Sequence, residues 1–148
     1  MTLRASTALR NKLLDTSPFR TIFNLGFIRV YDGPVPASAD AALDAANHLL
    51  VTMSISGGGT GLTFAASASG GAITKTLAET WSGVAIASGT ATFYRLVTPT
   101  DTGALSTTEA RLQGSVGTSG ADLNMTTTTL NSSTSYPVDS FSIALPTL

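Results

Sequence analysis

The sequence contains no cysteine, one histidine and few charged residues. The absence of cysteine excludes disulfides, thiolate zinc sites and cysteine nucleophiles. Charged residues make up 11% of the 148 residues, compared with about 25% in a typical soluble domain. Because the formal net charge is only -1, repulsion between molecules is weak and association is favoured. We therefore expect a single domain that works as a component of an assembly.

Long apolar runs are also missing. No stretch approaches the roughly 18 consecutive apolar residues of a membrane span, although the mean hydropathy is +0.26. Arg10 and Lys12 interrupt the first apolar stretch, so the beginning of the chain does not resemble a signal peptide. We predict no signal peptide and no membrane partner.

Residues that perform acid-base or nucleophilic chemistry are scarce. A serine nucleophile needs a histidine, but no Gly-x-Ser-x-Gly motif occurs, and His48 at the start of an alternating strand is typical of a surface or edge residue. Asp40 and Asp44 are separated by alanines and a leucine, which favours a solvated loop over a metal site. The glycine-rich run 57–61 lacks a following Gly-Lys-Ser/Thr and a helix, which favours a hairpin over a phosphate loop. We predict no enzymatic activity, no cofactor and no metal.

Alternating apolar and polar residues dominate the chain after residue 26. The alternation is cleanest in 48–55, and 27–31 is a second clear strand that ends at a Gly- and Pro-rich turn. Eight or nine short strands, spaced by about 8 to 12 residues, predict a mainly β fold, an antiparallel β-sandwich or jelly roll. We expect Trp81 in its core.

The N-terminal part has a different pattern. Ser6 or Thr7 is positioned to cap a short helix through Leu14, with Leu9 and Leu13 on the same face as Leu14. Residues 19–25 predict a second short helix that ends at a glycine. Two parts follow: a basic, part-helical arm (1–26) and a β-sandwich domain (27–148).

Charge is unevenly distributed between these parts. Residues 1–29 hold five cations and one acid, whereas the remaining residues hold three cations and eight acids. The basic segment is either a docked helix with solvated cations or an arm that docks on a partner. Because the cations are dispersed, and Phe19, Phe23 and Phe27 have the spacing of a packed helix, we expect no direct nucleic-acid role.

Several segments, spread over nearly the whole chain, carry a family resemblance: Arg10–Leu14 leading to Phe19, Ile28–Gly33, Pro36–Ala42, Arg95–Val97 and Arg111–Asn124. The most specific is Gly-Thr-Ser-Gly-Ala-Asp-Leu-Asn at 117–124. In these segments the chain resembles a family of small proteins encoded among the structural genes of tailed bacteriophages and prophages.

The resemblance implies a virion structural protein, a capsid cement or decoration protein that binds the outside of the major capsid protein shell. It also implies that the chain is made in the host cytoplasm and located on the capsid surface. A tail or fibre component with a host-binding β-sandwich is the alternative, and a carbohydrate-binding module or small enzyme is a third reading. The threonine-rich edge 126–129 is a candidate for pairing in a homodimer or homotrimer.

The basic arm is the segment that we expect to reach the shell subunits. Its predicted docking charges are Arg4, Arg10, Lys12 and Arg20, and its predicted apolar anchors are Leu9, Leu13, Phe19 and Phe23.

Overall fold

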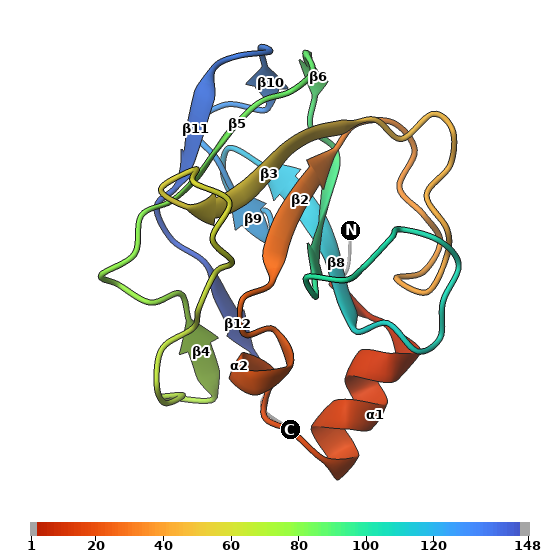
Figure 1. Cartoon of the computed structure of the whole chain (residues 1–148), viewed down its shortest axis with the longest axis vertical. Coiled ribbons are helices and arrows are strands. Elements are labelled where there is room, and N and C mark those ends of the chain that lie inside the picture. The colour runs from red at the N-terminus through yellow and green to blue at the C-terminus, as the bar shows by residue number, and fades with distance from the viewer. Residues whose placement is uncertain (1–2, 146–148) are drawn as a thin grey trace.

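The computed structural model describes residues 3–145. Within this range the chain forms two helices, α1 (Thr7–Asp15) and α2 (Phe19–Ile22), and is otherwise built from strands and loops (Figure 1). The strands are β1 (Arg4–Ala5), β2 (Phe27–Tyr31), β3 (Leu49–Ile55), β4 (Ala72–Thr74), β5 (Trp81–Val84), β6 (Gly89–Thr90), β7 (Phe93–Val97), β8 (Arg111–Gly117), β9 (Leu123–Asn124), β10 (Thr129–Leu130), β11 (Ser135–Val138) and β12 (Ser142–Ala144).

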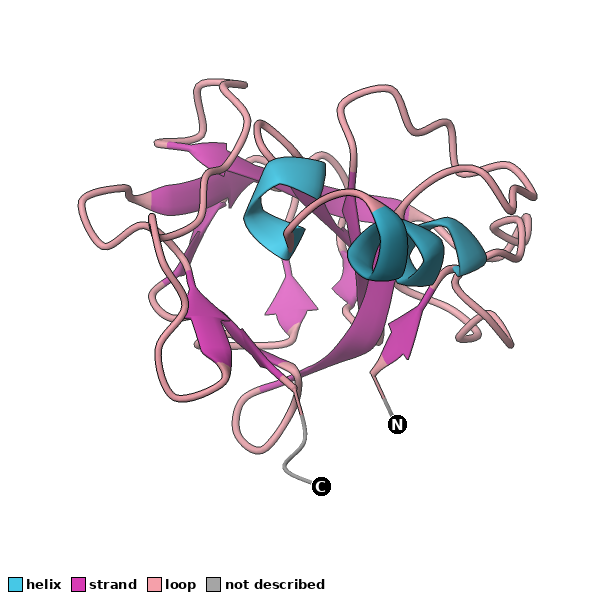
Figure 2. Ribbon diagram, turned by 90° about the horizontal axis from the view of Figure 1, so that it is seen from below, coloured by secondary structure: helices cyan, strands magenta, loops and turns pink. Residues whose placement is uncertain are grey.

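The main sheet has eight strands. Seven of them follow the order β1-β8-β7-β2-β3-β5-β11 with antiparallel neighbours, and β9 pairs with β8 in parallel. Two antiparallel ribbons, β6-β10 and β4-β12, complete the fold. Figure 2 shows the strands curving around a common interior, with α1 and α2 across one end.

The alternation in the sequence explains which face of the sheet is buried. Ile28 and Val30 on β2 are paired with Met53 and Val51 on β3, and all four side chains lie in the core. Trp81 is also fully buried, as predicted. An aromatic cluster fills the interior, in which the ring of Phe141 contacts those of Phe64, Trp81 and Tyr94.

The predicted mainly β, antiparallel fold with a short N-terminal helical segment is confirmed. A sheet that curves around one core is consistent with a sandwich, and the jelly-roll connectivity stays a prediction. The run 62–65, whose Leu and Phe alternate with small residues as in a strand, makes isolated bridges and no continuous strand. Thr129, in the edge proposed for pairing between copies, is paired with Thr90 of its own chain.

The N-terminal segment is part of the same core. β1 is paired with β8, and the Ser6 hydroxyl caps α1 by accepting the Leu9 N–H. Leu9 is buried, but Leu13 and Leu14 on the last turns of α1 are exposed, so the three leucines predicted on one face do not share one environment. The sheet contacts only the beginning of α1, which then extends away from it (Figure 1). Within residues 3–145, no helix is long and apolar enough to cross a membrane.

Candidate functional site

One face of the main sheet carries a row of polar side chains. Arg29 on β2 is paired with Arg95 on β7, Arg95 with Gln113 on β8, and Gln113 with Arg4 on β1. Directly paired residues of antiparallel strands point to the same face, so these four side chains form a row across four strands. Arg111 lies two residues before Gln113 and shares its face. We call these five residues the arginine row.

Two loops cover this row: the alanine loop (residues 32–48) and the threonine loop (residues 98–110) (Figure 1). The backbones of the two loops are joined, because Leu43 N–H donates to Gly103 O at 3.1 Å and Ser106 N–H donates to Asp40 O at 3.0 Å. Four side chains of the row donate to carbonyl oxygens of the alanine loop: Arg4 to Pro36 and Ala37, Arg95 to Ser38 and Ala41, Arg111 to Ala39, and Gln113 to Pro36.

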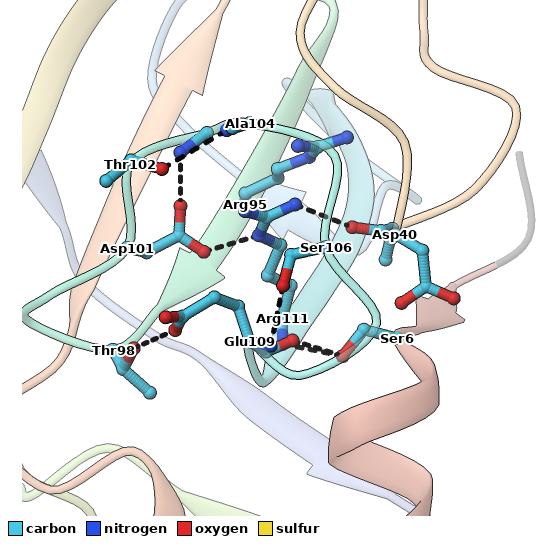
Figure 3. A network of polar contacts seen from close by, with 12 residues as sticks. Ser6, Asp40, Arg95, Thr98, Asp101, Thr102, Ala104, Ser106, Glu109 and Arg111 are labelled. Atoms are coloured by element: carbon cyan, nitrogen blue, oxygen red, sulfur yellow. Dashed lines mark hydrogen bonds and ion pairs between the residues drawn. The ribbon is translucent and has the colours of Figure 1, made fainter.

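The threonine loop contributes the carboxylate that balances part of this positive charge. Arg111 Nε donates to Asp101 Oδ2, and both side chains are at most 1% exposed (Figure 3). The Arg29 guanidinium donates to the backbone oxygen of Asp101 at 2.9 Å. Asp101 Oδ1 also accepts the Gly103 N–H at 2.7 Å, which fixes the carboxylate within its own turn.

Positive charge exceeds negative charge beneath the loops. Burial, together with the neighbouring charge of Arg111, lowers the pKa of Arg95 to about 10. Arg95 Nε donates to Gln113 Oε1 at 2.9 Å, whereas Arg95 Nη1 and Arg111 Nη2 are buried without a hydrogen-bond partner among the described residues. Asp101, which is paired with Arg111, and Asp40 supply the negative charge that favours the charged form of Arg95. Removing one partner of a buried ion pair is strongly destabilising.

The start of α1 is bound to both loops. Ser6 Oγ donates to Glu109 O and accepts the Arg111 N–H, each at 2.9 Å (Figure 3). The N–H and hydroxyl of Thr7 donate to the two carboxylate oxygens of Asp40 at 2.9 and 2.7 Å. These bonds connect residues far apart in sequence, and they tie the first turn of α1 to the two loops and to the sheet.

The structure divides the eight predicted interface residues into three groups: buried, half-buried and exposed. Leu9 and Phe23 lie in the core, so in this conformation they cannot act as anchors for a partner. Arg4 belongs to the arginine row, and the half-buried Phe19 packs its ring against Phe23 and Phe64. The remaining residues are exposed: Arg10, Lys12, Leu13 and Arg20.

Within residues 3–145, the cationic residues that are exposed are Arg10, Lys12 and Arg20, all on α1 and α2. Leu14, four residues after Arg10 and on the same side of α1, is 85% exposed. The other five cations are buried or half-buried and donate to carbonyl oxygens of the chain itself: Arg4, Arg29, Lys75, Arg95 and Arg111.

The single histidine, His48, is hydrogen-bonded to Asp32, so the two ends of the alanine loop are held together. His48 Nδ1 lies 3.0 Å from Asp32 Oδ1, and the His48 N–H donates to the same oxygen at 2.7 Å. Burial opposes ionisation of Asp32, but these hydrogen bonds and the His48 charge hold its pKa below the usual range. The His48 side chain is 66% exposed, which confirms the predicted surface position.

The most specific segment of the family resemblance forms the connection between β8 and β9. Asp122 Oδ2 accepts both the N–H and the hydroxyl of Ser115 at 2.8 Å, and Asn124 Oδ1 accepts the Ala121 N–H at 3.1 Å. These polar residues therefore have a structural role. Two shallow grooves of about 320 and 240 Å³ lie beside this connection and share Asn124 and Ser140 in their linings.

Comparison with known proteins identifies no relative of this chain. No family model, curated protein or solved structure matches the chain. Within residues 3–145, no three His, Cys, Asp or Glu side chains are grouped so that they could hold a metal ion. The sequence pattern located the cations of α1 and α2, but it could not identify the arginine row, because its residues are paired across four strands.

Proposed function

We propose that this chain is a structural protein of a bacteriophage virion, a cement or decoration protein that binds the outside of the major capsid protein shell and stabilises it. The family resemblance of 117–124 and the other segments supports this role, as does a composition with only 11% charged residues. The observation that carries the proposal is the use of the arginine row to hold two surface loops in one shape.

A cement protein needs a contact surface that already has its bound shape. Ordering side chains and loops on binding costs about 0.5–1.5 kcal/mol per immobilised long side chain, which reduces affinity. The hydrogen bonds from the arginine row to the alanine loop remove much of this cost before a partner arrives. A modest contact of this kind, repeated by the symmetry of a shell, stabilises the whole particle.

The copy number of the chain in purified particles tests this role. Quantitative mass spectrometry against the major capsid protein should give on the order of hundreds of copies in fixed ratio to the shell. A few copies to a few dozen would assign the chain to the tail or a fibre. Absence from the particle would refute a virion role.

A further inference from the structure

We infer that α1, α2 and the threonine loop form one contact surface, and that it binds an acidic protein surface with an apolar centre. The inference rests on the proposed function, because the partner that would carry this acidic surface is a shell subunit. The residues that define the contact surface are Arg10, Lys12, Leu13, Leu14, Arg20 and Leu105.

Exposed positive charge gathers on the two helices. The cations that are exposed within the described residues lie on α1 and α2, because the others donate to carbonyl oxygens inside the chain. The rest of the surface therefore offers little positive charge to an acidic partner. Complementary charge guides association and sets which surfaces meet, so this is the part of the chain that an acidic surface would select.

The contact surface also carries exposed leucines. Leu14 is 85% exposed at the end of α1 and Leu105 is 74% exposed in the threonine loop, and Leu13 adds further apolar area. The threonine loop meets the first turn of α1 (Figure 1), where Ser6 Oγ donates to Glu109 O at 2.9 Å. Apolar side chains flanked by polar and charged ones resemble the core and rim of a protein interface.

Hydrogen bonds hold α1 and the threonine loop together. Ser6 and Thr7 tie the first turn of α1 to the threonine loop and the alanine loop, respectively. Asp101 ties the threonine loop to the buried Arg111. The two parts of the contact surface are thus fixed relative to each other, and one partner can contact both without reordering them.

A protein partner fits this surface better than a nucleic acid. Three dispersed cations neutralise few phosphates, and a phosphate backbone gives the leucines nothing to pack against. An acidic protein surface with apolar side chains at its centre satisfies both the cations and the leucines.

Binding to shells assembled from the major capsid protein of the same phage tests the inference, with bound chain measured by sedimentation. Leu14→Ser and Leu105→Ser should each weaken binding by roughly tenfold or more, since each removes buried apolar area. Leu77→Ser is the control, because Leu77 is also largely exposed, at 90%, but lies between β4 and β5. Unchanged melting temperatures would show that all three variants are folded.

A matched pair of variants tests the charge argument. Lys12→Gln/Arg20→Gln removes two positive charges from the contact surface, and Thr80→Glu/Thr90→Glu produces the same net charge by changing exposed threonines elsewhere. We expect the first pair to weaken binding and reduce its dependence on salt, and the second to bind like the wild type. Equal binding by both pairs would overturn the charge argument.

The outcomes separate the inference from the proposed function. If the wild-type chain does not bind shells, the proposed function fails and the inference fails with it. If the wild type binds and the leucine variants bind equally well, only the inference is overturned. If Leu14→Ser instead dissociates an oligomer of the free chain, the surface belongs to a second copy and the inference is likewise overturned. Binding to phage DNA that Lys12→Gln/Arg20→Gln abolishes would assign the surface to nucleic acid.

Discussion

Replacing Asp101 with asparagine tests how far the loops depend on one buried carboxylate. Asp101 and Arg111 form an ion pair whose side chains are at most 1% exposed, and Asp101→Asn leaves Arg111 buried without a charged partner. Breaking a buried pair in this way costs about 3–5 kcal/mol of unfolding free energy. For a chain of this size, the melting temperature should fall by roughly 6–20 °C.

Urea denaturation, followed by the fluorescence of the single, buried Trp81, measures this loss. Asp139→Asn is the control, because it makes the same change in charge at an exposed position and should alter stability by at most about 0.5 kcal/mol. Asp101→Asn/Arg111→Met removes both charges and should be more stable than Asp101→Asn alone. A loss below about 1 kcal/mol for Asp101→Asn would refute the reasoning.

Three further variants test separate parts of the structure. Both Gly33 and Gly59 have positive φ, but only at Gly33 would a Cβ meet a carbonyl oxygen, at 2.2 Å. Gly33→Ala should therefore lower the free energy of unfolding, measured in urea, by roughly 1–3 kcal/mol more than Gly59→Ala. Equal losses would contradict the packing of the alanine loop. Leu9→Ala should cost about 2–5 kcal/mol and Leu14→Ala at most about 0.5 kcal/mol, and the reverse order would contradict the orientation of α1. The folded-state pKa of Asp32 is below its ordinary value of 3.8, so this carboxylate stabilises the fold above that pH and its contribution is lost as the pH falls through the folded value. The stability difference between the wild type and Asp32→Asn should therefore shrink on acidification, and a constant difference in urea midpoint would exclude this linkage.

The parts of the fold that follow local rules could be predicted from the sequence. β2 begins and ends at the predicted residues, and β3 begins one residue later than predicted. This agreement follows because alternation along a strand directly reflects which face is buried. The helix cap was equally local, since the Ser6 hydroxyl accepts an N–H three residues further on.

The roles of the cations could not be predicted in the same way. Arg4 stands in the basic N-terminal segment, yet its guanidinium donates to carbonyl oxygens more than thirty residues away. Nothing in the local sequence indicates that Arg95 and Arg111 are buried, because an arginine in a strand is ordinarily placed on the solvent side. Only the tertiary structure shows that two loops cover that side. For the same reason, the burial of Leu9 beside the exposure of Leu14 depends on where α1 leaves the sheet.

Cryo-electron microscopy of the purified virion with icosahedral averaging tests the central claim most directly. We predict density for this chain on the outer surface of the shell, with α1 and the threonine loop turned towards the major capsid protein. Density for the chain confined to the tail, or a capsid-bound chain with α1 and the threonine loop facing solvent, would contradict this account.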